Sequence, residues 1–329
     1  MTTLLDHFDS RTAAAASAEA NRTNPAQRLR ATMAAARVSF TWMGTQKTLT
    51  ADQIARAAGT FDAEAKSLSA GKKLLDTRHP AFRAVTAIRT KVTDCWRGMS
   101  LPYPEPGLRL IRQDRIEEFA RQMADYKVEL DDAVRNLDRH YGELKHAAAE
   151  RLGSLYNADD YPESLVGLFD VQWDFPSFEP PDYLRLLCPA VFEQERARVA
   201  ARFDEAVQLA ESAFLEEFAR LVTHLCDRMT GVGEDGQPRV FRDSAVDNLS
   251  DFFGRFGELN VRSNEQLDEL VERARRAVRG VAAQDLRDSQ TLRQRVAGQL
   301  AGVQSSLDSM LVERPRRRIL RQATAPGEA

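Results

Sequence analysis

The chain has 329 residues, a formal net charge of −3 and a charged-residue content of 29%. This near-neutral charge argues against a general nucleic-acid coat protein, which is basic throughout. The three cysteines, Cys95, Cys188 and Cys226, are far apart without a CxxC pair, so neither a disulfide framework nor a zinc site is expected. The start lacks the features of a secretory signal, and no run of about 18 apolar residues occurs. We therefore expect a cytoplasmic protein.

The first third of the chain predicts an arm followed by a small mixed region. Residues 1–33 are rich in Ala, Ser and Asn, have little apolar periodicity, and predict a flexible or loosely helical N-terminal arm. Residues 34–112 predict a small α/β region. Within it, "VSFTWMGTQKTLT" (38–50) alternates apolar and polar residues and is interrupted at Gly44. This pattern predicts a small β-hairpin.

Helix signals follow the predicted hairpin. Thr50 with Gln53 three residues later predicts a capping box and a short helix that ends near Gly59. Apolar residues at helical spacing predict a second helix over residues 79–99, which stops before a proline cluster. The next short apolar run, "LRLI" at 108–111, predicts a strand.

Residues 113–230 predict a long antiparallel helical hairpin that packs like a coiled coil. Apolar residues recur every three or four positions over 113–156 without a proline, which predicts one long helix. The second stretch, 190–229, has an apolar stripe with an eleven-residue period, which is typical of nearly straight helix pairing. Two long helices joined by a short segment normally lie antiparallel. The stripe contains Phe192, Val199, Phe203, Val207, Ala210, Phe214, Phe218, Leu221, Leu225 and Met229.

The joining segment, residues 158–189, would form the tip of this hairpin. It carries seven acidic residues and one basic residue, and its prolines prevent helix continuation. Alternation over 171–175 predicts a short strand. An acidic, aromatic tip predicts a partner-binding surface, although the same aromatics would also serve to fold the tip onto the helix ends. The predicted partner-binding residues are Trp173, Phe175, Phe178 and Tyr183.

The C-terminal third predicts a helical bundle and a basic tail. Residues 240–313 contain three amphipathic helices, with caps expected at Asp243 or Ser244 and at Ser263, and the last helix over about 286–313. Residues 314–329 form an Arg-rich tail that predicts phosphate or acidic-protein binding. The alternative is a solvated tail that suits the helix dipole. The tail arginines are Arg314, Arg316, Arg317, Arg318 and Arg321.

No pattern in the chain predicts catalysis, a cofactor or a metal site. The five histidines do not form HExxH, and we expect them to be isolated. The run "SAGKKLL" (69–75) lacks the first glycine and the Ser/Thr of a phosphate loop, and no GxSxG motif occurs. We expect a protein that is not an enzyme.

Three stretches together resemble an uncharacterised, largely helical family of phages, plasmids and other mobile elements. They are "VSFTWMGTQKTLT", "VFRDSAVDNLSDFFGRFGELNV" and "RPRRRI", and the resemblance spans about residues 36–319. Genes of that family often lie beside a MoxR-type AAA+ ATPase and a von Willebrand A-type protein. The resemblance implies an accessory subunit or client of an ATPase-driven assembly, and it supplies no catalytic residue.

The sequence thus favours a mainly α interaction or scaffold protein that binds a protein partner or associates with itself. One alternative is a nucleic-acid-associated protein that uses the C-terminal arginines. A second alternative is a membrane-acting helical protein similar to a pore-former, against which the acidic tip argues.

Overall fold

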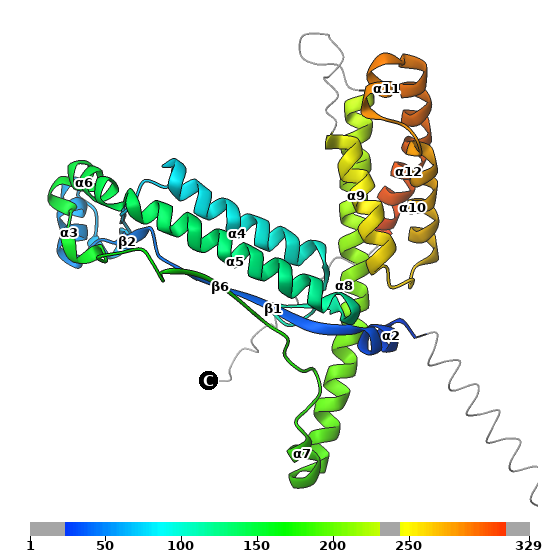
Figure 1. The fold of residues 1–329 in the computed structure, drawn as a ribbon, viewed down its shortest axis with the longest axis horizontal. Helices are drawn as coiled ribbons and strands as arrows, with labels where there is room; N and C mark the ends of the chain where they lie inside the picture. Colours follow the sequence, from blue (N-terminus) through cyan, green and yellow to red (C-terminus); the bar gives the residue numbers. More distant parts are fainter. Residues whose placement is uncertain (1–23, 231–243, 314–329) are drawn as a thin grey trace, which may run out of the picture. The chain divides into compact units, whose positions relative to one another are not determined.

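The computed structural model describes residues 24–230 and 244–313 (Figure 1). Residues 1–23 of the predicted arm, residues 231–243 and the predicted Arg-rich tail 314–329 lie outside the described residues. The predicted mainly α fold with a small β element is confirmed.

The described chain divides into two compact units. The α/β unit is built from residues 32–101 and 105–189, and the helical unit from residues 24–31, 102–104, 190–230 and 244–313. Each unit has its own buried core, so each is described separately.

A four-stranded sheet with the order β4-β5-β1-β6 forms the centre of the α/β unit. Residues 33–37 of β1 pair antiparallel with β5, and residues 37–42 pair antiparallel with β6. β1 therefore joins two strands that are far apart in the sequence. The strands are β1 (Met33–Trp42), β4 (Ser100–Pro102), β5 (Leu108–Arg112) and β6 (Phe169–Asp174).

The predicted hairpin over residues 38–50 is wrong. β1 does not pair with the next strand, β2 (Gln46–Thr48), which instead pairs with β3 (Gly71–Lys73) in a separate two-stranded ribbon. The reason is burial. The apolar side chains of β1 require an apolar partner, which β6 supplies through the Val38–Trp173 pair, whereas all three β2 residues are exposed and polar.

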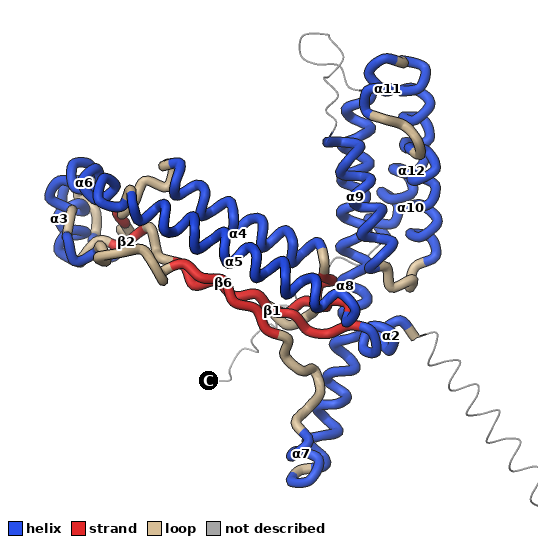
Figure 2. Tube along the Cα trace, viewed as in Figure 1, coloured by secondary structure: helices blue, strands red, loops and turns tan. Residues whose placement is uncertain are grey.

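Helices cover the sheet of the α/β unit. α4 and α5 pack against each other, and α5 also packs on β6 (Figure 2). The predicted capping box at Thr50 and Gln53 is confirmed at the start of α3. The helix predicted over residues 79–99 is also confirmed, as α4. The helices of this unit are α3 (Ala51–Thr60), α4 (Pro80–Gly98), α5 (Ile116–Arg139), α6 (Tyr141–Leu152) and α7 (Asp182–Leu187), with short 3-10 turns at Ala65–Ser67, Gln113–Arg115, Gly153–Leu155 and Ala158–Asp160.

The structure corrects the predicted long hairpin. The expected single helix over 113–156 breaks at His140, whose N–H donates to Leu137 O instead of continuing the i−4 pattern. Gly142, which has low helix propensity, follows the break. After α6 the chain returns along the sheet as β6, so residues 158–189 are not a hairpin tip. α5 belongs to the α/β unit and α8 to the helical unit, and helix pairing between them is not confirmed.

The helical unit is built around one helix of 42 residues, α8. Its bounds agree with the predicted helix over 190–229. α9, α10 and α12 run beside its C-terminal part (Figure 1), which confirms that these sequence regions form helices that pack together. The helices are α2 (Pro25–Thr32), α8 (Pro189–Thr230), α9 (Ser244–Leu259), α10 (Glu265–Val278), α11 (Ala283–Asp288) and α12 (Gln290–Glu313).

The predicted apolar stripe of α8 packs against α9. Phe218 is fully buried and stacks on Phe252 with ring centroids 5.1 Å apart, and Phe214 meets Phe256 edge-on at 5.1 Å. Burying each such ring contributes about 1.5–3 kcal/mol. An ion pair between Arg255 and Glu217 at 2.6 Å flanks this aromatic seam. The apolar stripe with the eleven-residue period thus packs into the core of the helical bundle.

Two helix boundaries differ from the prediction. Asn264, not Ser263, caps α10 by accepting a hydrogen bond from Leu267 N at 3.0 Å. The predicted last helix is divided at Ser289, whose Oγ accepts from Leu292 N and starts α12. At the other end of the chain, α2 joins the helical unit through Arg28, which donates to the backbone oxygen of Val261 at 2.7 Å.

Candidate partner-binding surface

The segment from residue 158 to 189 contains the predicted partner-binding residues, and the structure gives it two different parts. Residues 158–174 are attached to the α/β unit through a 3-10 turn and strand β6. Residues 175–189 contain Pro176, Pro180 and Pro181 and then the short helix α7. The two parts bury their side chains to very different extents.

Two of the four predicted aromatics pack onto the α/β unit. Trp173 is half-buried against the core of the unit, opposite Val38 on β1. The ring of Phe175 lies edge-on to Phe119, with centroids 6.1 Å apart, and is 37% exposed. Trp173 and Phe175 therefore contact their own unit, as the alternative of aromatics that fold the segment predicts. Phe178 is half-buried.

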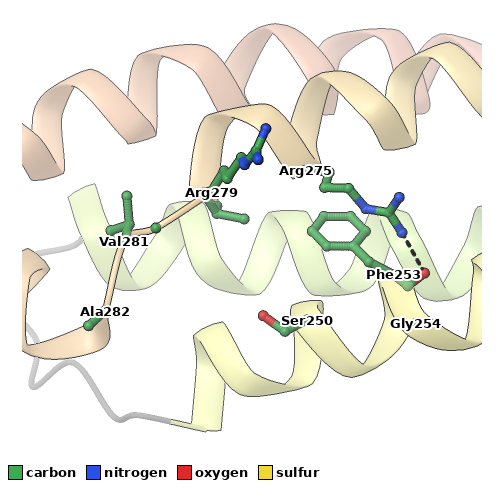
Figure 3. Close-up of a pocket in the computed structure, with 9 residues that line it drawn as sticks. Ser250, Phe253, Gly254, Arg275, Arg279, Val281 and Ala282 are labelled. Atoms are coloured by element: carbon green, nitrogen blue, oxygen red, sulfur yellow. Dashed lines mark hydrogen bonds between the residues drawn. The ribbon is translucent and has the colours of Figure 1, made fainter.

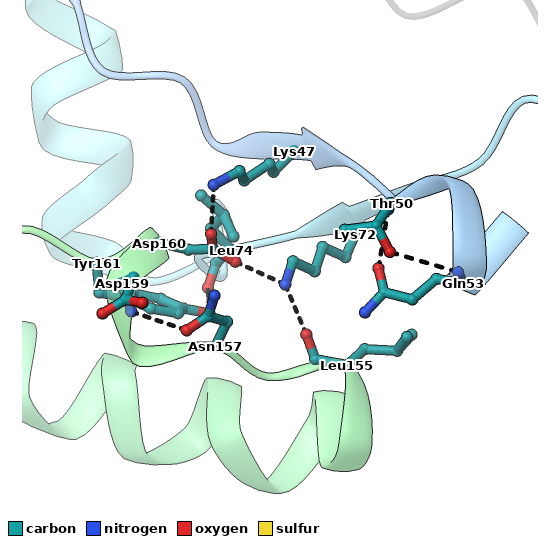
Figure 4. A network of polar contacts seen from close by, with 10 residues as sticks. All are labelled: Lys47, Thr50, Gln53, Lys72, Leu74, Leu155, Asn157, Asp159, Asp160 and Tyr161. Atoms are coloured by element: carbon teal, nitrogen blue, oxygen red, sulfur yellow. Dashed lines mark hydrogen bonds and ion pairs between the residues drawn. The ribbon is translucent and has the colours of Figure 1, made fainter.

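Asp160 holds the beginning of the segment in place. Its side chain is 2% exposed and forms an ion pair with Lys72 Nζ at 2.6 Å and another with Lys47 (Figure 4). Lys72 is itself buried, and its Nζ also donates to Leu155 O at 2.6 Å. The ammonium groups of Lys47 and Lys72 lower the pKa of Asp160 below its usual value of 3.8. This network ties the β2–β3 ribbon to the turn that precedes β6.

Two further acids of the segment are also paired within the α/β unit. Asp170 accepts from Lys127 Nζ at 2.7 Å. Asp174 forms a two-pronged pair with Arg37, at 2.9 and 2.6 Å, and this hydrogen bonding lowers the pKa of the Asp174 carboxyl. Three of the seven acids therefore have cationic partners nearby, so the negative charge predicted for a contact surface is partly neutralised.

The exposed part of the segment is α7. Tyr183 is 59% exposed, Leu186 81% and Leu187 74%. Spacings of three and four residues place these side chains on one face of the helix. We call Tyr183, Leu186 and Leu187 the α7 apolar surface. Large apolar side chains this exposed on a short, proline-flanked helix indicate a contact surface.

Leu186 and Leu187 are functional candidates that the sequence reasoning missed, since it weighed only aromatic residues. The signal was present in "PPDYLRLLCP", where apolar residues at helical spacing lie between prolines. A helix this short is stable mainly when its apolar face packs against another surface. An exposed apolar face on it therefore indicates contact with a partner.

The structure brings together two histidines that were expected to be isolated. The rings of His79 and His140 lie with centroids 5.3 Å apart, and His79 Nδ1 accepts from Ala81 N at the start of α4. Across residues 24–230 and 244–313, no group of three or more His, Cys, Asp or Glu is placed to hold a metal ion. The predicted tail arginines, Arg314, Arg316, Arg317, Arg318 and Arg321, lie outside the described residues.

None of the helices within the described ranges is long and apolar enough to cross a membrane. Comparisons with protein-family models, curated proteins and solved structures found no match to this chain.

Proposed function

We propose that the protein is a non-enzymatic interaction or scaffold protein that inserts α7 into an apolar groove of a partner protein. The observation that carries the proposal is the α7 apolar surface, with Leu186 81% and Leu187 74% exposed. A short amphipathic helix laid into a groove is a recurring mode of recognition, anchored by residues at i, i+3 and i+4.

The surroundings of α7 support a protein partner. Pro180 and Pro181 precede the helix and Pro189 follows Cys188, and prolines limit the conformations that must be ordered on binding. Asp182 lies in the first turn, so a groove with a basic rim would complement it. The resemblance to mobile-element proteins makes an AAA+ ATPase one such proposed partner, with self-association as the alternative.

The proposal is tested by site-specific photo-crosslinking in the native host. p-Benzoylphenylalanine replaces Leu187 in one protein and Val128 in the control. Val128 is 60% exposed on α5 in the same unit. The expected result is a protein that crosslinks from position 187 but not from position 128.

The crosslinked partner is then purified and its affinity measured. Burying each leucine contributes about 1.5–3 kcal/mol, so Leu186→Asp with Leu187→Asp should weaken binding by about tenfold or more. The matched control changes Val128 and Val166, which are 60% and 58% exposed, to Asp and should bind as the wild type does. Equal binding by both double variants would contradict the proposal. A crosslink to a second copy of this chain would identify self-association.

A further inference from the structure

The helical unit contains a groove that the proposed function does not use. It lies between α9, the end of α10 and the turn that leads into α11, with a volume of about 580 Å³ (Figure 3). Its lining combines the apolar side chains of Phe253, Val278 and Val281 with polar groups of Ser250, Arg275 and Arg279. The residues that line it are Ser250, Phe253, Gly254, Arg275, Val278, Arg279, Gly280, Val281 and Ala282.

One wall of the groove is held rigid by Arg275. Its guanidinium donates to Phe253 O at 2.8 Å, pairs with Glu272 at 2.9 Å and lies 5.5 Å from the centroid of the Phe253 ring. Phe253 in turn is buried against Phe218 and Phe252. The groove is therefore built on the aromatic seam of the bundle, and a bound group would meet a preformed surface.

Arg279 supplies a cation at the edge of the groove. It is exposed, and among the described residues no acidic side chain pairs with its guanidinium. The surrounding sequence is basic, because residues 273–295 contain seven arginines and two aspartates in a chain of net charge −3. An anionic group is thus favoured here although the protein as a whole is slightly acidic.

Gly254 leaves room for a ligand at the edge of the groove. It lies inside α9, where glycine costs roughly 0.5–1 kcal/mol relative to alanine. A Cβ added to it would meet nothing within 4 Å, so neither the packing of this helix nor a positive φ requires glycine. A glycine on the surface of a helix, at the edge of a groove, permits close approach by another chain.

We infer that this groove binds a peptide segment of a partner that carries an apolar side chain next to one or more carboxylates. The apolar side chain would lie on Val278 and Val281, and a carboxylate would pair with Arg279. The apolar side chains of the lining favour a peptide over nucleic acid, whose backbone offers phosphates but no apolar anchor. The site belongs to the helical unit and is independent of the α7 apolar surface.

The test uses the full-length protein and a random peptide display library as the probe. Peptides are selected on the wild type and counter-selected on Gly254→Leu, in which the added side chain fills the open space above α9. The expected pool is enriched in acidic residues beside apolar ones. Affinities of synthetic peptides from that pool should fall about tenfold or more with Gly254→Leu.

Two matched controls separate the groove from general effects. Gly298→Leu introduces the same side chain at another helical glycine with open space around it, on α12, and should leave affinity unchanged. Arg276→Glu makes the same charge change as Arg279→Glu three residues earlier, in the last turn of α10, but Arg276 does not line the groove. Only Arg279→Glu should lower affinity by about tenfold. If Gly254→Leu fails to fold, as judged by circular dichroism, the two arginine variants decide the question.

Several outcomes would overturn the inference. They are a pool without acidic enrichment, no selectable peptide, or equal affinity for the wild type and Gly254→Leu. A fluorescent oligothymidine serves as a second probe. Should it bind, compete with the peptides and be weakened equally by Arg276→Glu and Arg279→Glu, the surface is a nucleic-acid site and the peptide inference is wrong.

Discussion

The two units of the molecule bury their key side chains in different ways. In the helical unit, phenylalanines from α8 and α9 form one cluster, so that Phe214, Phe218, Phe252 and Phe256 all contact one another through shared neighbours. In the α/β unit, the aromatic contacts are spread along the sheet, and the end of the unit depends on a buried charge network around Asp160. From this difference we expect truncation of apolar side chains to destabilise the helical unit most. Loss of charged partners should instead destabilise the α/β unit.

The cysteines allow the two units to be followed separately. Cys226 on α8 is buried, and burial raises the pKa of its thiol to about 11. Burial also raises the pKa of Cys95 on α4, whereas Cys188 is exposed. Because the thiolate is the reactive form, alkylation of Cys226 reports opening of the helical unit and alkylation of Cys95 reports opening of the α/β unit.

The largest effect is expected from Phe218→Ala. This fully buried ring stacks on Phe252 with an interplanar angle of 2°, and removing it should lower the free energy of unfolding by about 3–5 kcal/mol. Urea denaturation followed by circular dichroism measures the loss. Alkylation of Cys226 should accelerate while that of Cys95 stays unchanged.

Phe192→Ala on the same helix is the control, because Phe192 is only partly buried. It should cost less than Phe218→Ala. Equal losses for the two variants, or equal acceleration at both cysteines by Phe218→Ala, would mean that the seam does not hold the helical unit in particular.

A smaller effect is expected in the α/β unit from Lys72→Met. The side chain of Lys72 is 6% exposed and bonds to both Asp160 and Leu155 O. Its removal leaves the buried Asp160 carboxylate and the part-buried Leu155 O each short of a donor, and should cost about 1–3 kcal/mol. Lys47→Met removes the other partner of Asp160, but the Lys47 side chain is 56% exposed, so its loss should cost about 0–1 kcal/mol. Denaturation midpoints of the two variants give the comparison, and the opposite ranking would contradict the assigned burial.

Asp160→Asn should change how stability depends on pH. Because the folded pKa of Asp160 lies below its usual 3.8, the ionised form stabilises the fold above that value, and the contribution is lost as pH falls through the folded pKa. The wild type should therefore exceed Asp160→Asn in stability near neutral pH, and the gap should narrow as the pH falls below 3.8. Urea titrations across this range measure the gap, and a gap independent of pH would refute the ion-pair explanation.

The smallest effect is a gain. Gly254→Ala should raise the free energy of unfolding by about 0.5–1 kcal/mol, since alanine is the better helix former and its Cβ has open space. Thermal melts monitored by circular dichroism check the sign. Destabilisation would show that the space above α9 is filled in solution.

The sequence predicted those parts of the fold that depend on residues a few positions apart in the chain. The stripe of α8 and the capping box at Thr50 follow from residues a few positions apart, and both are present. The partners of β1 were beyond this reasoning. Alternation identifies a strand but not its neighbour, and the residue that β1 meets at Val38 is Trp173.

The candidate site was only partly predictable for the same reason. The segment around residues 171–183 was recognised as unusual, but alternation and composition do not tell which side chains will find partners. Asp160 became buried because Lys47 and Lys72 come from a ribbon far away in the sequence. Leu187 stayed exposed on the short helix α7, which the composition of the segment did not reveal.

The hydrogen bond from Arg28 on α2 to Val261 can form only late in synthesis. β1 follows α2 directly in the sequence and can complete its sheet once β6 has been made. The Arg28–Val261 bond, in contrast, joins residues 233 positions apart. At roughly 5–20 residues per second, a ribosome needs about 10–50 s to make that stretch. Leu29, on the same helix, is buried in the finished protein. The Arg28–Val261 bond of α2 therefore forms only after most of the chain has been made.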